Sequence, residues 1–305
     1  MTQRTIAIVV NARSANGRDD DLRARIEAAL PPDAGRLLWF QPRKASRLDR
    51  VCQRATTVAD LVIAVGGDGT VRTVAQHARA RGKPMAIIPT GTYNLVARHL
   101  GIPLDVADAA RLAVTGHARP TPCGDINGLL FFNHAAFGLY TRIIAARERH
   151  TAVLGRSRVT AVLSGIATLF NRYPILKLRL QTDGAPQHCH ANAAFFGANP
   201  LPLAAVDAEF AEQCDGHALG LVLMRHQGRR HVLMAALKSL FGRLSDAPTF
   251  ELTALQSITV DILRRRRRLR VSIDGELIKC RLPLQLHYQP DALQIVRPDP
   301  LESDA

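Results

Sequence analysis

The N-terminal third of the chain alternates short apolar runs with segments of helix length, and no other feature constrains the fold as much. The apolar runs are rich in β-branched residues and lie at residues 5–10, 36–40, 61–65 and 85–88. Apolar residues recur three or four positions apart in the helix-length segments, which are residues 19–30, 46–56, 70–81, 92–100 and 106–115. Continuous apolar strands suit a parallel sheet that is buried on both faces. The sequence therefore predicts a doubly wound α/β domain.

The pattern changes after Pro120-Thr121-Pro122, which interrupts the alternation and predicts a domain boundary. Short β-like stretches separated by turn residues follow, with the spacing of a β-sandwich: residues 129–133, 176–181, 191–196, 218–224, 257–262 and 268–273. Helical insertions are predicted at residues 153–170 and 230–244. We therefore expect an α/β domain over residues 1–121, a β-sandwich domain over residues 122–287, and a return of about residues 288–305 to the first domain.

The composition is that of a globular protein that stays in the cytoplasm. Hydrophobic residues make up 47% of the chain, yet no apolar run reaches the roughly 20 residues that a membrane span needs. Polar residues end the first apolar run before it could form the core of a signal peptide. Five scattered cysteines without a Cys-x-x-Cys pair predict free thiols. His188-Cys189-His190 does not predict a zinc site, because a strand sends alternate residues to opposite faces.

The charge balance predicts an anionic partner. Forty Lys and Arg against 26 Asp and Glu give a net charge of +14, which attracts nucleic acid, an anionic membrane face or a phosphorylated ligand. Five consecutive arginines, Arg264–Arg268, form either a solvated hairpin connection or an anion-facing turn, which we favour. The basic amphipathic segment at residues 229–244 suits either a membrane surface or packing against the sandwich.

The sharpest motif is Val65-Gly66-Gly67-Asp68-Gly69-Thr70, which follows a predicted strand and opens a predicted helix. Glycines let the backbone approach a ligand closely, and amides at a helix start point toward an anion. The spacing is neither that of the dinucleotide fingerprint nor that of the P-loop. Similar turns also occur for packing alone, but an acidic residue serves packing poorly. The motif predicts a phosphate-binding turn.

Two further loops are expected at the same edge of the sheet. Pro89-Thr90-Gly91-Thr92-Tyr93-Asn94 again stands between an apolar strand and a helix, and residues 11–17 follow the first strand. Loops after parallel strands line one crevice, where such sheets bind ligands. A phosphate site explains the three loops together better than helix capping does.

These motifs resemble the catalytic domain of the diacylglycerol kinase family, which is related to sphingosine kinases and bacterial lipid kinases and has an NAD kinase-like fold. The resemblance extends from Thr5 to Pro298. Three later segments also match the family's elements in order: Asn127-Gly128 with residues 132–138, Cys214-Asp215-Gly216, and Ile273-Asp274-Gly275-Glu276. Asp274-Gly275 by itself would indicate a hairpin turn.

The resemblance implies an ATP-dependent lipid kinase that phosphorylates the hydroxyl of diacylglycerol or a related lipid, with Mg²⁺ as cofactor and ATP between the two domains. Glu276 matches the family's proton acceptor, and Asp68 is its rival. Asp215 matches a magnesium ligand, with backbone carbonyls of Glu212 and His217 beside it. The residues matching nucleotide-binding positions are Asn11, Arg13, Gly66, Gly67, Asp68, Gly69, Thr70, Val71, Arg72, Gly91, Thr92, Asn94, Asp274 and Gly275.

The partners expected on this basis are ATP, a lipid alcohol and the anionic inner face of the membrane, and no nucleic acid is expected. The sequence does not decide whether the protein forms a homodimer. Arg72 and Thr73 stand where the family usually has Asn-Glu, and Pro122 replaces a usual aspartate, which puts turnover in doubt. Two alternatives therefore remain: a soluble NAD kinase-like enzyme that phosphorylates a small molecule, and a non-catalytic member that binds lipid or nucleic acid.

Overall fold

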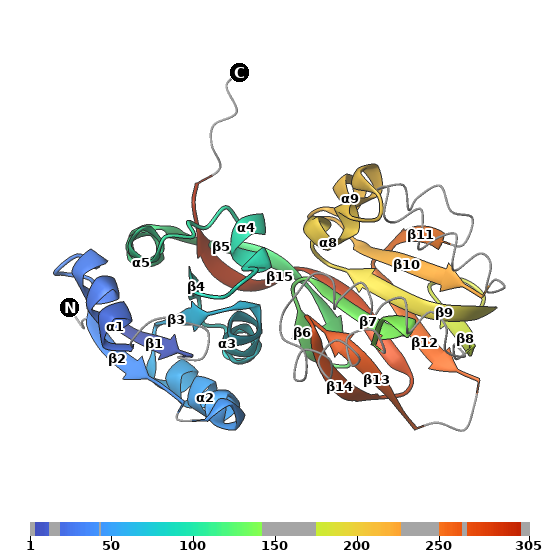
Figure 1. Ribbon diagram of the computed structural model, residues 1–305, viewed down its shortest axis with the longest axis horizontal. Coiled ribbons are helices and arrows are strands. Elements are labelled where there is room, and N and C mark those ends of the chain that lie inside the picture. The colour runs from blue at the N-terminus through green and yellow to red at the C-terminus, as the bar shows by residue number, and fades with distance from the viewer. Residues whose placement is uncertain are drawn as a thin grey trace, which may run out of the picture. The chain divides into compact units, whose positions relative to one another are not determined.

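The computed structural model of the protein describes residues 4–11, 19–42, 44–141, 175–226, 250–263 and 267–299. The chain divides into two compact units. Figure 1 shows the ribbon with colours that run from blue at the N-terminus to red at the C-terminus. The first unit comprises Met1–Cys123 together with Pro290–Ala305, and the second comprises Gly124–Gln289. The chain therefore leaves the first unit once and comes back to it at its C-terminal end.

A parallel sheet forms the centre of the first unit. Its strands are ordered β2-β1-β3-β4-β15, and each hydrogen-bonds to its neighbour in the parallel sense. Every residue of β3 is buried, as the continuous apolar run predicts. The strands are β1 (Thr5–Val10), β2 (Arg36–Phe40), β3 (Leu61–Gly66), β4 (Met85–Pro89) and β15 (Leu284–Arg297).

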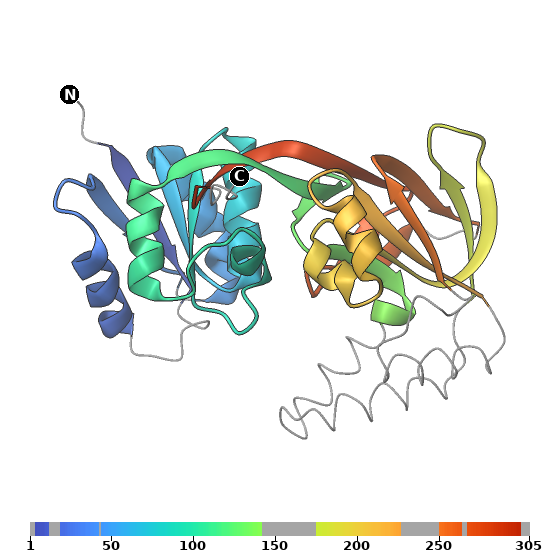
Figure 2. The ribbon, with the colours of Figure 1, turned by 90° about the horizontal axis from the view of Figure 1, so that it is seen from above.

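Helices cover both faces of this sheet (Figure 2). Helices α1 and α5 pack against each other, with α5 on β4, whereas α2 and α3 pack together against β1 and β3. The bounds are α1 (Asp19–Ala29), α2 (Leu48–Val58), α3 (Asp68–Ala80), α4 (Leu95–His99) and α5 (Val106–Thr115), with a 3-10 turn at Ala45–Arg47. The predicted doubly wound α/β arrangement is confirmed.

The second unit consists mainly of antiparallel strands. They pair in the order β14-β13-β7-β9-β8-β12-β15, and β10 and β11 extend from the other edge of β9. The bounds are β6 (Leu129–Phe131), β7 (His134–Gly138), β8 (Leu176–Gln181), β9 (Gln187–Gly197), β10 (Leu219–Arg225), β11 (Phe250–Leu255), β12 (Ser257–Ile262), β13 (Arg268–Ile273) and β14 (Glu276–Arg281). The prediction of an all-β region after the α/β domain is confirmed.

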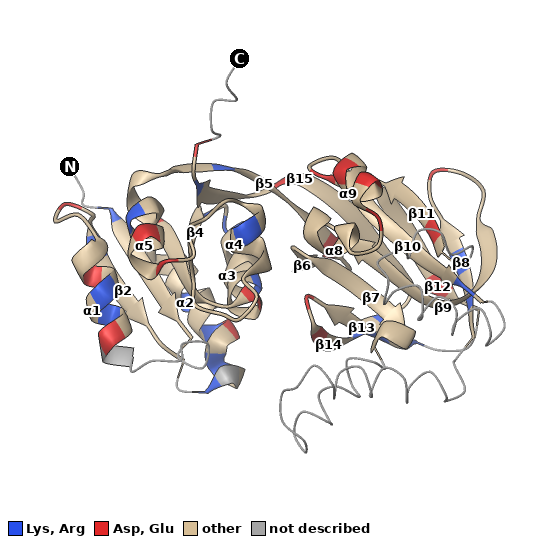
Figure 3. Cartoon of the chain, turned by 45° about the horizontal axis from the view of Figure 1, so that its top comes forward, with Lys and Arg blue, Asp and Glu red and all other residues tan. Residues whose placement is uncertain are grey.

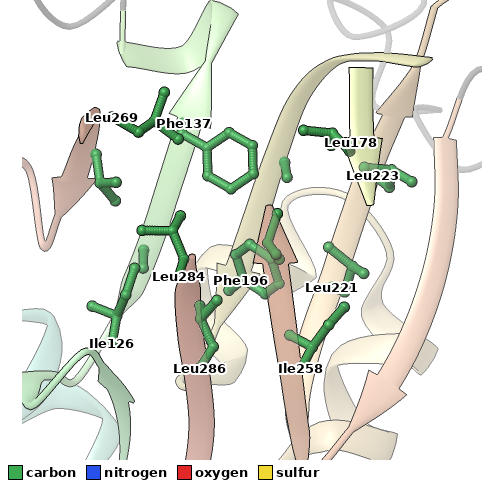
Figure 4. Close-up of a cluster of buried hydrophobic side chains, with 14 of the residues drawn as sticks. Ile126, Phe137, Leu178, Phe196, Leu221, Leu223, Ile258, Leu269, Leu284 and Leu286 are labelled. Atoms are coloured by element: carbon green, nitrogen blue, oxygen red, sulfur yellow. The ribbon is translucent and has the colours of Figure 1, made fainter. Parts of the chain in front are cut away.

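Alternate residues of these strands fill one hydrophobic core. Phe137 and Phe196 pack at its centre with ring centroids 6.2 Å apart, and aliphatic residues from the other strands surround them (Figure 4). Outside this core, the short helices α8 (Pro200–Ala204) and α9 (Ala208–Cys214) cover part of the sheet through Leu203 and Phe210. The sequence pattern missed both helices because five and seven residues are too few to display helical periodicity.

Strand β5 (His117–Ile126) contains the prolines that were expected to end the alternation of strands and helices. The two units divide within this strand, after Cys123. Strand β5 pairs with β15 and β6, and its pairing with β6 covers only Gly124–Ile126, so both prolines lie outside that pairing. Proline is tolerated where its missing N–H is not needed by a neighbouring strand. The helical insertions predicted at residues 153–170 and 230–244 lie outside the described residues.

The arginine block connects strands that are not neighbours. Strand β12 pairs with β8 and β15, whereas β13 pairs with β14 and β7. The interpretation of this block as a hairpin connection is therefore wrong, because a hairpin would pair β12 with β13. Of its five residues, only Arg267 and Arg268 are described.

All five cysteines are buried and free, which confirms the predicted thiols. Burial raises the pKa of the Cys52 thiol to about 12, so this side chain stays protonated and unreactive at neutral pH. Within the described ranges, no helix combines the length and the apolar character that crossing a membrane requires.

Candidate functional site

Three polar loops leave the parallel sheet at the carboxyl ends of its strands. Asn11 follows β1, Gly67 follows β3 and Thr90 follows β4. Strand β1 lies between β2 and β3, so the direction of strand succession reverses beside it. Sheets of this kind bind ligands outside the carboxyl ends at such a switch point. The fold therefore places the three predicted loops at the edge where a ligand is expected.

Hydrogen bonds hold the three loops together. The side-chain amide of Asn11 donates to the Thr70 hydroxyl at 2.9 Å, and the Asn11 backbone amide donates to the Val65 carbonyl at 3.0 Å. The backbone amide of Thr90 donates to the Gly66 carbonyl at 3.1 Å. The structure thus brings together residues from the first, second and third predicted loops.

The glycines of these loops allow the loops to approach one another. A Cβ on Gly66 would lie 2.6 Å from the Thr70 side chain, and a Cβ on Gly91 would lie 2.5 Å from the Gly67 Cα. Real Cβ atoms do not approach other atoms so closely. Gly66 and Gly91 are therefore required by loop packing, in addition to any contact with a ligand.

Asp68 is the first residue of α3 and reaches across to α4. Its Oδ1 accepts a hydrogen bond from the Val96 backbone amide at 3.1 Å. A carboxylate at a helix start also interacts favourably with the amides that have no partner within the helix. Asp68 therefore ties the second loop to the third, a positioning role that sequence reasoning did not anticipate.

The third loop is closed by Asn94, which adopts a left-handed conformation with φ of 51°. Its side-chain oxygen accepts from the Gly91 amide and its side-chain nitrogen donates to the Gly91 carbonyl, both at 3.0 Å. This reciprocal pair fixes the loop while Thr92 and Tyr93 remain exposed. Thr92 is consequently accessible to a ligand, whereas Asn94 is occupied in shaping the loop.

Two other predicted nucleotide-binding residues are turned inward. The side chains of Val71 and Arg72 are only 2% and 8% exposed. The Gly69 carbonyl accepts a hydrogen bond from the Thr73 hydroxyl within α3 at 2.8 Å. The Val71 amide donates to the Gly67 carbonyl at 3.1 Å, so Val71 contributes to packing and offers a ligand neither its side chain nor its amide. Arg72 is no freely exposed cation. Arg13 lies outside the described residues.

Asp274, another predicted site residue, lies in the second unit and is bound to backbone amides. Its carboxylate accepts from the amides of Phe132, Asn133 and His134 at 2.8–2.9 Å, and its own amide donates to the His134 carbonyl at 2.9 Å. The partners lie about 140 positions earlier in the chain. Asp274 therefore connects the β13–β14 hairpin to the start of β7.

The β13–β14 connection is the two-residue hairpin turn that Asp274-Gly275 indicates. Both residues have positive φ, 47° and 89°, as a type I′ turn requires. Glu276 follows directly as the first residue of β14, and its side chain is exposed. The predicted turn is confirmed, and it presents the Glu276 carboxylate to solvent.

The predicted magnesium ligands cluster at the end of α9. Asp215 caps the helix, and its amide donates to the carbonyls of Ala211 and Glu212 at 3.1 and 3.2 Å. The His217 carbonyl accepts from the Gln256 side chain. Nowhere in the described ranges do three His, Cys, Asp or Glu side chains converge on a point that could hold a metal. Any site here would therefore depend on backbone carbonyls.

His134 is a titratable residue that the sequence analysis did not propose as functional. Its ring stacks on Phe195 with centroids 5.0 Å apart, and its Nε2 lies 3.1 Å from the Tyr140 hydroxyl. Burial lowers the pKa of His134 to about 4, so the ring is neutral at physiological pH. The neighbouring Asn133 accepts a hydrogen bond from Asn199 in a fully buried pair at 3.1 Å.

Comparisons with known proteins agree with this architecture. The family description of the diacylglycerol kinase catalytic domain matches residues 5–126. The chain is 46% identical over 149 residues to "Probable lipid kinase YegS-like" of Pseudomonas aeruginosa, an alignment that covers 48% of each protein. It is 30% identical over 268 residues to the protein of the same name in Serratia proteamaculans, covering 81% of this chain and 84% of that one.

A solved structure of a diacylglycerol kinase from Bacillus anthracis has the same fold, with a TM-score of 0.71 at 21% identity over 98% of both chains. A parallel α/β unit followed by a mainly antiparallel unit is thus the diacylglycerol kinase fold. The chain belongs to the diacylglycerol kinase catalytic domain family, and its relatives include the YegS-like proteins. The resemblance seen in the motifs is confirmed, although the alignment with the Pseudomonas relative spans only about half of that protein.

Proposed function

We propose that the protein is an ATP-dependent lipid kinase, which transfers the γ-phosphoryl group to the hydroxyl of diacylglycerol or a related lipid. The observation that carries this proposal is the joined set of loops at the carboxyl edge of the parallel sheet. Asn11, the turn at residues 66–70 and the loop at residues 91–94 are bonded into one surface at the start of two helices. Family membership supports both ATP and a lipid as reactants.

These residues are suited to holding phosphates. Phosphoryl transfer requires positioning and charge neutralisation more than covalent help from the protein. Backbone amides of Gly67 and Gly69 and the exposed Thr92 hydroxyl supply donors for phosphate oxygens. Asp68 contributes by keeping α3 and α4 at a fixed spacing through its bond to the Val96 amide.

We assign the proton acceptor to Glu276. A general base must reach the hydroxyl that it deprotonates, and Glu276 is exposed as the first residue of β14, directly after the Asp274-Gly275 turn. Asp68, the rival, uses one carboxylate oxygen to accept the Val96 amide. Asp274 has three backbone amides to accept from, so it serves to hold the turn that presents Glu276.

Mg²⁺ fits the donor set at the end of α9. The Asp215 carboxylate and the carbonyl oxygens of Glu212 and His217 are the hard oxygen ligands that this ion prefers, and each carbonyl keeps a second lone pair. An ion held there would add positive charge to the second unit and stabilise the α9 end. We give this ion a structural role.

The decisive experiment incubates the purified protein with labelled ATP, Mg²⁺ and a panel of lipid alcohols in detergent micelles, and then extracts the lipid. We expect label in the lipid extract, and most of it with diacylglycerol or a close relative. Gly67→Val, which puts a branched side chain toward the Gly91 Cα, should abolish labelling. Gly184→Val is the matched control, because Gly184 has open space around it.

Two other outcomes would replace this proposal. Label on NAD in the aqueous phase would identify a soluble NAD kinase-like enzyme. Lipid binding without any ATP consumption would identify a non-catalytic member, an alternative favoured by the inward position of Arg72 where the family usually has Asn.

A further inference from the structure

Four basic side chains face one another across the β13–β14 hairpin. Arg268 lies directly opposite Arg281, and Arg270 lies directly opposite Lys279. All four are exposed, on elements whose basic residues Figure 3 draws in blue. We call these four residues the cation hairpin.

Strand alternation places the cation hairpin on the outer face of the sheet. The intervening residues Leu269, Val271 and Cys280 are buried in the core of the second unit. Side chains of successive residues point to opposite faces, so the four cations share the face turned away from that core. The hairpin therefore presents a compact and rigid array of positive charge.

This arrangement opposes stability. Like charges directly opposite each other on an antiparallel pair repel. Within the described part of the chain, no ion pair compensates any of the four residues, whereas Arg179 and Arg225 elsewhere in this unit each have a carboxylate partner. Because this repulsion destabilises the folded protein, the four cations are better explained by a role in binding than by a role in stability.

Protection of the sheet edge does not explain the whole array. Strand β14 is the last strand of the sheet, and Lys or Arg on an edge strand discourages pairing with other chains. Arg268 and Arg270 also lie outside the stretch of β13 that pairs with β7, which is Val271–Ile273. Edge protection does not require like charges directly opposite each other, however, and the hairpin has two such pairs.

We propose that the cation hairpin is the surface with which the protein docks on an anionic lipid bilayer. The net charge of +14 supplies long-range attraction, and Arg268 is the last of the five consecutive arginines. The hairpin carries no aromatic residue on which nucleic acid bases could stack, so a bilayer suits it better than single-stranded nucleic acid. The choice of a lipid surface rests on the proposed lipid kinase function.

Docking in this way would bring the second unit to the bilayer that holds the proposed substrate. Glu276 and Lys279 lie on the same strand, three residues apart, which is about 10 Å along a β-strand. Because successive side chains of a strand point to opposite faces, Glu276 lies on the face opposite the four cations. The cation hairpin therefore recruits the membrane, and it does not itself place the Glu276 carboxylate against it.

The test measures binding to sedimented vesicles of phosphatidylglycerol and phosphatidylcholine, without ATP. Each Lys or Arg near an anionic surface contributes a factor of about five, so R270Q/K279Q should bind about 30-fold more weakly than wild type at low salt. The matched control is R50Q/R54Q, which removes two exposed arginines of α2 for which no ion pair is found among the described residues. This control removes the same charge outside the cation hairpin, so it should change binding by no more than about twofold if the hairpin and not net charge is responsible.

Several results would overturn the proposal. Equal losses in both variants would make net charge responsible, and unchanged binding of R270Q/K279Q would make the cation hairpin irrelevant. A loss of duplex DNA binding without a loss of vesicle binding would assign the hairpin to nucleic acid. The urea midpoint of R270Q/K279Q should equal or exceed that of wild type, since the change relieves repulsion. A lower midpoint together with weaker binding would indicate damaged folding and reject this interpretation.

Failure of this proposal is distinguishable from failure of the proposed function. Lipid phosphorylation in uncharged detergent micelles tests the kinase activity with no anionic surface present. In that assay, R270Q/K279Q should retain wild-type turnover, whereas its activity on anionic vesicles should fall in parallel with binding.

Discussion

The two units use the same dipeptide, Asp-Gly, for opposite purposes. In the first unit, Asp68-Gly69 opens a helix, and the Asp68 carboxylate accepts one backbone amide. In the second unit, Asp274-Gly275 forms a hairpin turn, and the Asp274 carboxylate accepts three backbone amides. The difference teaches that the motif alone does not assign a role: a single bonded amide lets Asp68 link α3 to α4, whereas three amides make Asp274 the anchor of a hairpin.

The largest expected effect tests whether Glu276 or Asp68 is the general base. Glu276→Gln should lower kcat about 10²- to 10⁴-fold, the usual contribution of a general base, while the free energy of unfolding stays within about 0.5 kcal/mol. Asp68→Asn keeps an oxygen for the Val96 amide, so its kcat should fall less than that of Glu276→Gln. Steady-state kinetics of both variants decides the matter, and the reverse order would make Asp68 the base.

The structural role of Asp274 predicts a large loss of stability. Asp274→Ala removes the acceptor of three backbone amides. It also puts alanine at a positive φ, which alanine adopts at a cost. The free energy of unfolding should therefore fall by about 3–5 kcal/mol. Asp274→Asn retains one acceptor oxygen and tolerates the left-handed conformation, so it should lose less. Urea unfolding measures both, and a loss below about 1 kcal/mol for Asp274→Ala would contradict the role.

His134, next to these amides, makes the stability of the second unit depend on pH. The folded protein holds the pKa of His134 at about 4, below the value of 6.5 in the unfolded chain. Between pH 6.5 and 4 the unfolded state therefore binds more protons, and the free energy of unfolding should fall by up to about 3 kcal/mol as the pH drops through that range. In His134→Gln, the free energy of unfolding should depend less on pH over this range. If its pH dependence equalled that of wild type, groups other than His134 would be responsible.

The close contact of loops in the first unit predicts a moderate effect. Gly91→Ala puts a Cβ 2.5 Å from the Gly67 Cα, which is backbone and cannot rotate away. Overpacking of this kind should cost about 1–3 kcal/mol of stability and weaken ATP binding. Gly184→Ala, in open space in the second unit, should be close to neutral. Thermal unfolding and ATP titration report both effects, and equal behaviour of the two variants would remove the packing argument.

A third Asp-Gly pair, Asp215-Gly216, provides the smallest expected effect. If Asp215 holds Mg²⁺, the ion should raise the Tm of the native protein by binding it and not the unfolded chain. Asp215→Asn should reduce that Mg²⁺-dependent shift and leave the Tm without Mg²⁺ nearly unchanged. Equal shifts in the two proteins would exclude Asp215 as a ligand.

Local sequence was sufficient for most elements of the first unit. The apolar runs predicted β1 and β2 at the bounds observed, and the Gly66-Gly67 turn was placed correctly between β3 and α3. The Asp274-Gly275 hairpin was equally predictable, because its two positive φ values are a property of adjacent residues. Each of these features depends on interactions within a few positions of the chain.

Other features had no local signal. The prolines of β5 marked the end of the strand–helix alternation but did not indicate that these residues form a strand, which pairs with β15 and β6. For the arginine block, a hairpin connection was the alternative to an anion-facing turn, and it is excluded because β13 pairs with β14 and β7 and not with β12. The bond between Asp68 and the Val96 amide spans 28 positions, and the burial of Arg72 depends on what packs around α3.

The sequence by itself thus determined the alternation of strands and helices, the family and the positions of the glycine-rich and Asp-Gly turns, since backbone preference and apolar periodicity are local. Only the tertiary structure decided which carboxylate is held by amides and which is exposed. It brought the amides of residues 132–134 to Asp274 and set Arg268 opposite Arg281. The physical reason is that cross-strand register arises from the packing of a whole sheet onto its core, which no short stretch of sequence encodes.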